Sequence, residues 1–288
     1  MRRDRAKRLI YLEQSRYISD VLERFNMCDC KPVATPCDSS FVLSKSMSPV
    51  NVEEQEAMKG VPYSSGVGSL MYAMTATRPD IAFAVSALSA FMANPGEKHW
   101  IALKRVLRYL QGTRNYCLVL GGSKVELSAW CDADWANDKD TRRSVTGYIF
   151  KLGDGVISWQ SKRQATVAMS STEAEYMSAS HAAREAAFLH QLLSELGYKQ
   201  SSVTLHCDNQ SCIALISNPT YHQRSKHIDV QHHFVREKVE IGDITMKYVP
   251  TEQMVADALT KALPRVKHEW CMEALGLSTC SQSGSVEC

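Results

Sequence analysis

The sequence has no long apolar run and no cysteine framework. Its longest weakly polar run, residues 81–93, is interrupted by serines and falls short of the roughly 20 residues that a membrane span needs. The basic start of the chain leads into no apolar core of the kind found in signal peptides. The ten cysteines follow no repeating spacing, which is typical of reduced thiols. These absences predict an intracellular protein, cytoplasmic or nuclear, with no membrane partner.

The composition is that of a globular protein whose charge is unevenly distributed. Apolar residues make up 44% and charged residues 22%, which excludes general disorder. Lysines and arginines number 17 against 11 acidic residues in residues 1–124, and 16 against 20 in residues 125–288. A basic part joined to an acidic part is typical of a phosphate-binding region beside a region that collects metal ions.

The first 122 residues predict a mainly helical region. A strand is expected at residues 8–13 and an amphipathic helix at residues 15–27, whereas residues 31–62 lack periodicity and predict a loop. Two helices follow, the second opening at Arg78-Pro79-Asp80. A further helix at residues 97–111 places Lys104, Arg105 and Arg108 on its outward face, where they are expected to contact a nucleic-acid backbone.

After Gly121-Gly122 the pattern changes to that of an α/β domain. Three β-rich runs are separated by a charged loop and a Gly-Asp-Gly hairpin signal, which predicts an antiparallel three-strand meander. Helices and two more strands then alternate, which adds parallel strands to a mixed sheet flanked by helices. The expected strands are 125–132, 144–152, 156–161, 203–208 and 244–249, and the expected helices are 171–196, 210–217, 226–241 and 253–263. Residues 278–288 are expected to be a disordered tail.

Four acidic residues lie at ends of these elements. Asp132 and Asp208 end apolar strands, Glu175 is one turn into a long helix, and Asp257 is near the start of the last helix of the domain. Any one of them alone would be read as a solvated or capping acid. Ligand sites of α/β sheets gather at strand ends, and converging carboxylates need cations. Hard oxygen ligands favour magnesium or manganese, with paired ions about 4 Å apart suited to phosphodiester cleavage.

The segments around the four acids resemble the ribonuclease H motifs of copia-type retrotransposon Pol polyproteins. These segments are Cys131–Ala136 (CDADWA), Ser170–Tyr176 (SSTEAEY), His206–Gln210 (HCDNQ) and Val255–Lys261 (VADALTK). Residues 143–148, 158–164 and 226–229 are similar to the same family. Residues 69–74, 77–82 and 107–113 resemble the end of its reverse transcriptase. The resemblance covers nearly all of residues 60–277.

The resemblance implies a function and a division of the chain. Residues 1–122 correspond to a reverse transcriptase thumb/connection remnant, residues 123–264 to a ribonuclease H-like domain, and residues 265–288 to a C-terminal helix and disordered tail. The implied reaction is two-metal hydrolysis of the RNA strand of RNA–DNA hybrids, leaving a 3′-hydroxyl and a 5′-phosphate. Its catalytic metal ligands are Asp132, Glu175, Asp208 and Asp257, and its cofactors are two magnesium or manganese ions.

Two other functional interpretations stay open. The chain is alternatively a catalytically silent, nucleic-acid-binding remnant of a decayed element, or a segment of a longer polyprotein. Polymerases of this family need paired aspartates on a palm hairpin, and no two aspartates are adjacent in this chain. The chain is therefore not expected to polymerise by itself, and a polymerase palm and fingers region is an expected partner, in trans or in a longer chain.

Neighbouring acids are separated by geometry as well as resemblance. Glu173 and Glu175 are two residues apart on a helix, about 200° around its axis, so both cannot face one metal site. Ser170 followed by Glu173 predicts a capping box, which leaves Glu175 as the ligand. Asp132 and Asp134 share a strand face; the resemblance places the ligand at Asp132, and Asp134 is expected to be solvated.

Two further signals are set aside. Cys207, Cys212, His222 and His227 have a spacing that is superficially zinc-like, but Cys207 is expected to point away from Asp208 by strand alternation. Related ribonucleases H often carry a histidine on a loop before the last acid, and residues 249–257 contain none. That role is absent or filled by another residue, and His227, His232 and His233 are expected to be structural or solvent-facing.

Overall fold

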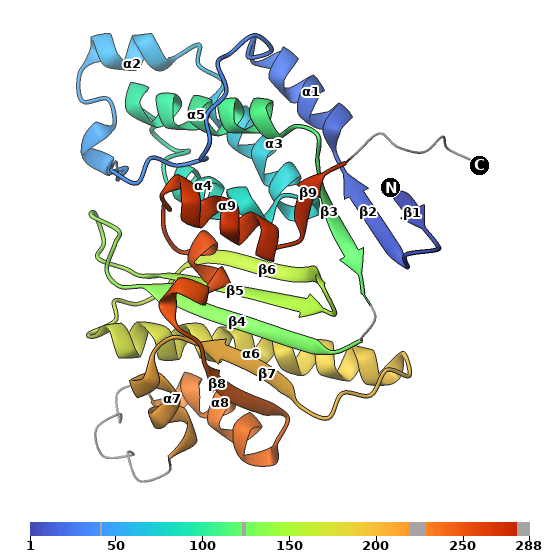
Figure 1. The fold of residues 1–288 in the computed structure, drawn as a ribbon. Coiled ribbons are helices and arrows are strands. Elements are labelled where there is room, and N and C mark those ends of the chain that lie inside the picture. The colour runs from blue at the N-terminus through green and yellow to red at the C-terminus, as the bar shows by residue number, and fades with distance from the viewer. Residues whose placement is uncertain (41, 123–124, 219–228, 281–288) are drawn as a thin grey trace.

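A five-stranded mixed sheet forms the middle layer of the protein (Figure 1). The computed structural model describes residues 1–40, 42–122, 125–218 and 229–280. The strands follow one another across the sheet as β6 (Gly155–Arg163), β5 (Val145–Leu152), β4 (Leu127–Asp134), β7 (Val203–Cys207) and β8 (Ile244–Tyr248). The first three pair antiparallel, and β4–β7 and β7–β8 pair in parallel. The expected ribonuclease H-like mixed sheet of the α/β class is confirmed.

One face of this sheet is covered by the long helix α6 (Ser171–Glu195). It packs against β4 and β5, and α7 (Gln210–Ser217) and α8 (Asp229–Ile241) pack against it in turn. Small side chains allow the close approach: Ala179, Ala182, Ala183 and Ala186 are fully buried. Leu127, Ala129 and Cys131 of β4 alternate toward this core.

On the other face of the sheet, one apolar cluster joins the sheet to the N-terminal helices and the end of the chain (Figure 1). These elements are α1 (Ser15–Arg24), α3 (Tyr63–Ala76), α4 (Ala82–Ser89), α5 (Glu97–Thr113), the 3₁₀ helix η6 (Val255–Leu259) and α9 (Arg265–Ala274). Ile149 and Val156 of the sheet belong to the same apolar cluster as Leu70 and Leu107 of the helices. The core on this face is therefore shared between the two halves of the chain.

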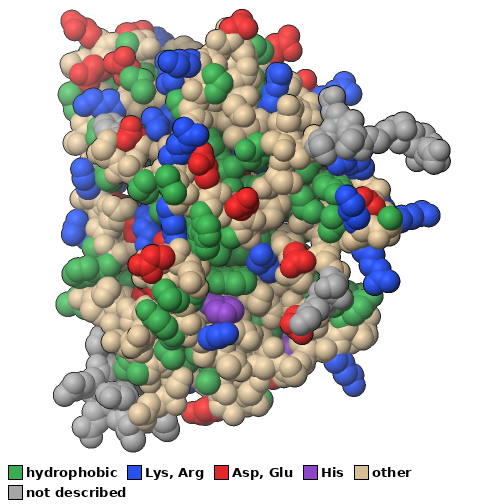
Figure 2. All heavy atoms as spheres, viewed as in Figure 1, with side chains coloured by type: hydrophobic (Ala, Val, Ile, Leu, Met, Phe, Trp, Pro, Cys, Tyr) green, Lys and Arg blue, Asp and Glu red, His purple; other side chains and the backbone are tan. Residues whose placement is uncertain are grey.

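A second, four-stranded antiparallel sheet was not predicted as such. It runs β1 (Arg2–Asp4), β2 (Leu9–Glu13), β3 (Tyr116–Gly121) and β9 (Leu277–Thr279). Only β2 was expected. The tail predicted to be disordered from Ser278 begins instead inside β9, because Leu277 is buried against β3; residues 281–288 lie outside the described part. Lysine and arginine side chains gather over the β1–β2 hairpin (Figure 2).

Smaller departures affect loops and helix ends. The expected loop at residues 31–62 contains η1 (Lys45–Met47) and α2 (Val52–Met58), and η2 (Pro79–Ile81) precedes α4. The helix expected at residues 253–263 is replaced by η5 (Thr251–Gln253) and η6. The helix expected from Lys226 is described from Asp229 onward. Among the described residues, no helix is long and apolar enough to cross a membrane.

Candidate active site

The four predicted acids meet at one edge of the five-stranded sheet. Asp132 lies near the end of β4, and Asp208 directly follows the end of β7. Glu175 comes from the first turns of α6, and Asp257 from η6. Asp132, Glu175 and Asp257 are 2%, 5% and 3% exposed, and Asp208 is half-buried. Four elements far apart in the sequence therefore bring four carboxylates together.

Asp132 and Asp257 share a lysine. The Nζ atom of Lys261 lies 2.8 Å from Asp257 Oδ1 and 3.7 Å from Asp132 Oδ2. The hydroxyl of Thr260 donates to Asp132 Oδ2, and Lys267 Nζ lies 3.6 Å from Asp257 Oδ2. This half of the acidic cluster is thus partly compensated by cations of the chain itself.

Glu175 and Asp208 form the other half. The Ala133 amide donates to Glu175 Oε1 at 3.2 Å, while Glu175 Oε2 is buried without a hydrogen-bond partner. The Thr251 hydroxyl donates to Asp208 Oδ2 at 2.8 Å. One oxygen each of Glu175 and Asp208 and the sulfur of Cys207 all lie within 4.8 Å of one another.

Burial and neighbouring charges shift the pKa values of three of these acids and of Lys261. Burial raises the pKa of Asp132 to about 7, and the charges of Asp257 and Asp208 add to the increase while Lys261 and Thr260 oppose it. Burial, and then the charge of Asp132, raise the pKa of Glu175 well above its ordinary range. Burial also raises the pKa of Asp208. Although burial lowers it, Asp132 and Asp257 raise the pKa of Lys261.

The donor set fits hard divalent cations. Four carboxylates supply oxygen ligands of the kind that magnesium and manganese prefer. The unpartnered Glu175 Oε2 is the kind of buried oxygen that a cation would satisfy. The raised pKa values of Asp132, Glu175 and Asp208 come first from burial, and the charges of neighbouring acids add to the shifts, so a bound cation would stabilise the ionised carboxylates.

Glu173 lies as predicted, whereas Asp134 does not. Glu173 Oε2 accepts from the Met169 amide at 2.7 Å, and Ser170 Oγ accepts from the Glu173 amide, so Glu173 serves the helix start. Asp134 is not solvated as expected: it is 8% exposed and accepts from the Val145 amide. Burial raises the pKa of Asp134 to about 6. The Val145 amide of the neighbouring strand β5 thus takes the place of water at Asp134.

The expectation that Cys207 points away from Asp208 is wrong. Strand β7 ends at Cys207, and Asp208 lies in a bend beyond it, so strand alternation no longer applies. His222 and His227 lie outside the described residues, as does any zinc-like grouping that would include them. The side chains of His232 and His233 are likewise not described.

The basic residues of α5 have partners within the protein. Arg105 Nη2 donates to Thr35 Oγ1 at 3.0 Å, and Arg105 Nη1 lies 3.4 Å from Asp38 Oδ2. Arg108 Nε donates to the Lys31 carbonyl at 2.7 Å, and Lys104 Nζ lies over the Trp100 ring. These contacts hold residues 31–38 against α5. Nucleic-acid binding by these three basic residues stays a prediction.

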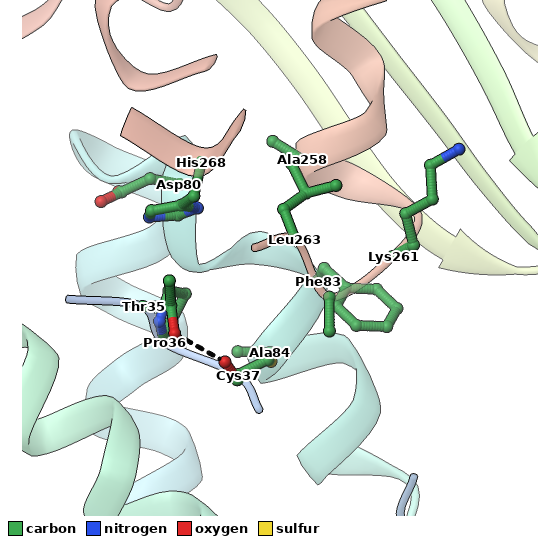
Figure 3. Close-up of a pocket in the computed structure, with 11 residues that line it drawn as sticks. Thr35, Pro36, Cys37, Asp80, Phe83, Ala84, Ala258, Lys261, Leu263 and His268 are labelled. Carbon is green, nitrogen blue, oxygen red and sulfur yellow. Dashed lines mark hydrogen bonds between the residues drawn. The ribbon is translucent and has the colours of Figure 1, made fainter. Parts of the chain in front are cut away.

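A small pocket lies behind the site, between the N-terminal helices and the last residues of the fold (Figure 3). Asp80 and His268 lie together at one side of it, and Phe83 and Leu263 line the other. The Lys261 side chain extends from this pocket toward the strands of the sheet, away from Phe83 (Figure 3). The lysine thus links the shared core to the acidic cluster.

Sequence reasoning missed the cations, hydroxyls and thiol that contact the acids. These residues are Cys207, Thr251, Thr260, Lys261 and Lys267. A signal existed for Lys261, since it follows Asp257 by four residues, the spacing at which opposite charges meet on a helix. No comparable local pattern marks Thr251 or Cys207, which reach the site through the ends of β8 and β7.

The chain is similar to one part of known transposon polyproteins. The chain matches no protein-family profile. It is 50% identical over 275 residues to the "Retrovirus-related Pol polyprotein from transposon TNT 1-94" of Nicotiana tabacum, covering 96% of this chain and 21% of that protein. It is 42% identical over 278 residues to the "Retrovirus-related Pol polyprotein from transposon RE1" of Arabidopsis thaliana, covering 95% and 18%. The chain therefore spans about a fifth of the length of these relatives.

Several solved structures align with about half of the chain. Among them, ribonuclease H1 from the halophilic archaeon Halobacterium salinarum NRC-1 aligns at 17% identity, covering 47% of this chain and 94% of that chain with a TM-score of 0.33. The two Pol polyproteins align with 96% and 95% of the chain. The chain belongs to the copia-type retrovirus-related Pol polyproteins of transposons and corresponds to one part of them.

Proposed function

We propose that this chain hydrolyses the RNA strand of RNA–DNA hybrids in a reaction that depends on magnesium or manganese. The observation that supports the proposal most is the meeting of Asp132, Glu175, Asp208 and Asp257 at one sheet edge, with a buried carboxylate oxygen of Glu175 left unpartnered. Structural acids at strand ends are normally solvated or paired, whereas burial and then neighbouring acids raise the pKa values of Asp132 and Glu175.

The four carboxylates would hold two divalent ions. When bound, such ions activate a water molecule and stabilise the leaving oxygen of a phosphodiester. The chain itself orients the ligands: the Ala133 amide fixes Glu175, the Thr251 hydroxyl fixes Asp208, and the Thr260 hydroxyl fixes Asp132. Three ligands are thus positioned by hydrogen bonds before any ion arrives, which reduces the cost of assembling the site.

The substrate class follows from the family and from nucleic-acid chemistry. Discrimination of RNA from DNA would come from contacts to 2′-hydroxyls across the shallow minor groove of the hybrid. Affinity would come mainly from phosphates and would fall as salt rises. In the longer Pol polyprotein context, a polymerase palm and fingers region is the proposed partner, and an intracellular location, cytoplasmic or nuclear, stays a prediction.

The test is cleavage by the purified chain of a hybrid labelled on the RNA strand. We expect RNA fragments ending in 3′-hydroxyl groups with magnesium or manganese and none after chelation. Zinc should not restore a chelated sample, because four carboxylates without imidazole suit hard cations. Restoration by zinc, or metal-independent cleavage, would contradict the proposal. Primer extension by the same preparation should be absent.

A catalytically silent remnant is the second candidate, and one observation favours it. Lys261 already places an ammonium group 2.8 Å from Asp257, in the half of the cluster where a cation would bind. If this lysine excludes metal permanently, the chain binds hybrid but does not cut it. In a silent remnant, the parent cleaves no hybrid, and Lys261→Met gains metal binding but no cleavage. In an active enzyme, the parent cleaves hybrid with Lys261 present.

A further inference from the structure

The thiol of Cys207 lies at the acidic cluster, although nothing in the proposed reaction uses it. Cys207 is fully buried at the end of β7. Its sulfur and one oxygen each of Glu175 and Asp208 are mutually within 4.8 Å. Among the described residues, this is the group of three or more histidine, cysteine, aspartate and glutamate side chains that is close enough to share an ion.

The three side chains have bonding capacity left. Glu175 is 5% exposed; its Oε1 accepts from the Ala133 amide and its Oε2 has no hydrogen-bond partner. Asp208 is held through Oδ2 by the Thr251 hydroxyl. The Asn209 amide donates to Cys207 Sγ at 3.4 Å, and the Cys131 and Cys212 side chains also hydrogen-bond to the Cys207 side chain. Lys261 and Lys267 lie against Asp132 and Asp257, in the other half of the cluster.

One sulfur and two carboxylates are not the donor set that magnesium prefers. Thiolate ligands select zinc and cadmium, and three protein ligands leave one position of a tetrahedral ion for water. Ligand atoms of a tetrahedral zinc site lie roughly 3.5 Å apart, given bonds of about 2.0–2.3 Å. Since the three atoms here are within 4.8 Å, small side-chain rotations bring them to bonding distance.

We propose that Cys207, Glu175 and Asp208 form a second kind of metal site, which binds a thiophilic divalent cation such as zinc or cadmium. Two of its three ligands also belong to the proposed magnesium site, so the two kinds of ion exclude each other. Zinc or cadmium at Cys207 then inhibits hybrid cleavage. The inhibition rests on the proposed function, whereas the binding does not.

Binding is tested with cadmium, because cadmium–thiolate bonds absorb in the near ultraviolet. The titration uses the full chain carrying Cys28→Ser, Cys30→Ser, Cys37→Ser and Cys280→Ser, since Cys28 is exposed and the other three are partly exposed. We expect a saturable absorption band that is lost in Cys207→Ser and in Cys207→Ala. The matched control is Cys271→Ser, a thiol of α9 that is equally buried but outside the group of three, and it should keep the band.

The carboxylate ligands are tested by affinity. Glu175→Gln and Asp208→Asn keep the sulfur and hence the band, but each should raise the cadmium dissociation constant more than about tenfold, the loss that removing a mere supporting partner already causes. Excess magnesium should displace cadmium from the parent. Far-ultraviolet circular dichroism confirms that each variant is folded, and the alanine and serine variants at Cys207 serve as independent replacements.

The outcomes separate this site from the proposed reaction. A band that persists in both Cys207 variants, or an affinity that neither carboxylate variant changes, overturns the site. A chain that cleaves no hybrid but shows Cys207-dependent cadmium binding keeps the site and loses the proposed function. If hybrid is cleaved, cadmium should inhibit the parent and the Cys271→Ser variant, and the Cys207→Ser variant should resist; equal inhibition of all three refutes the regulatory role.

Discussion

The protein has two buried groups of charged residues, and only one of them is fully paired. In the N-terminal region, Arg78 and Asp80 are 0% and 2% exposed and are joined by two hydrogen bonds, of 3.0 and 2.7 Å. Arg78 also donates to the carbonyl and hydroxyl of Thr113, and the Tyr109 hydroxyl donates to Asp80. His268 of α9 closes the network at the Tyr109 hydroxyl. At the sheet edge, by contrast, Glu175 keeps an unpartnered oxygen.

The pKa directions follow this difference. Despite burial, Arg78 holds the pKa of Asp80 below its ordinary value, because the bidentate contact stabilises the carboxylate. Burial and neighbouring acids instead raise the pKa of Asp132 to about 7. The fully paired charge fits a structural role, and the incompletely paired cluster is the proposed site for cations.

The first change removes one charge from the incomplete cluster. Glu175→Gln preserves size and helix propensity, and we expect it to reduce hybrid cleavage by several orders of magnitude while hybrid binding is kept or slightly tightened. The assays are cleavage of labelled hybrid and electrophoretic mobility shift. Glu173→Gln is the matched control: its amide oxygen can still accept from the Met169 amide, so activity should persist and stability should fall by less than about 1 kcal/mol.

The opposite pair of results would show that the orientation assigned to the two glutamates of α6 is wrong. An inactive Glu173→Gln beside an active Glu175→Gln would mean that the wrong glutamate faces the metals. If the parent and both variants bind hybrid and none cleaves it, the silent remnant is the better interpretation.

The second change breaks the complete network. Arg78→Met leaves Asp80 buried without its cation, and we expect the free energy of unfolding to fall by about 3–5 kcal/mol. Urea denaturation monitored by circular dichroism measures the loss. Arg105→Met is the control, because the Arg105–Asp38 pair is partly exposed, and it should cost no more than about 1 kcal/mol. Equal losses in both variants would remove the distinction between buried and exposed pairs.

The third change removes an acid whose ionisation the fold opposes. The pKa of Asp132 is raised to about 7, so its contribution to stability is present below its ordinary pKa and is lost as pH rises through 7. Without divalent ions at pH 8, Asp132→Asn should therefore be more stable than the parent by about 1.4 kcal/mol or more, the value of one pKa unit. Magnesium should stabilise the parent and leave the variant nearly unchanged.

Thermal unfolding with and without magnesium measures this effect. A metal-free Asp132→Asn variant that is less stable than the parent at pH 8 would show that Lys261 and Thr260 compensate Asp132 fully. The acidic cluster would then resemble the Arg78 network, and the contrast between the two regions would fail.

Local patterns explain which parts of the site were predictable. Helix periodicity and the capping residue Ser170 placed α6 and assigned Glu173 and Glu175 to different roles. Strand ends placed Asp132 and Asp208. The contacts of Lys261 and Cys207 could not be read in this way, because they depend on a 3₁₀ turn in place of a helix and on a bend beyond a strand.

Long-range pairing explains most of what was missed in the fold. Strand β9 pairs with β3 across some 160 residues, and three residues carry too little pattern to predict a strand. The division into residues 1–122, 123–264 and 265–288 stays a proposal. Ile149 and Val156 pack with the N-terminal helices, so a fragment that begins after residue 122 would expose an apolar sheet face.

The fourth and smallest effect concerns another fully satisfied group, His99 of α5. Its ring stacks on Phe91 at 4.0 Å, Nδ1 accepts from the Gly96 amide at 2.9 Å, and Nε2 is 3.1 Å from the Ser44 carbonyl, to which it donates in this tautomer. Burial lowers the pKa of His99, and the Ser44 carbonyl and the charge of Asp140 oppose that shift. Protonation at Nδ1 would remove the bond from Gly96.

Because the pKa of His99 is lowered, its stabilisation is present above the ordinary histidine pKa of about 6.5 and is lost as pH falls through the folded value. The contribution of His99 is the difference in the free energy of unfolding between the parent and His99→Gln, measured by urea titration, and it should be smaller at pH 5 than at pH 7.5. The acidic cluster is common to both proteins, so its opposite pH dependence cancels in this difference. An unchanged slope in His99→Gln would assign the acid sensitivity to other groups, beginning with His268, whose pKa burial also lowers. The stabilisation from His99 is thus lost as pH falls, whereas that from the acidic cluster is lost as pH rises. The two regions therefore contribute opposite slopes to the free energy of unfolding in one pH titration.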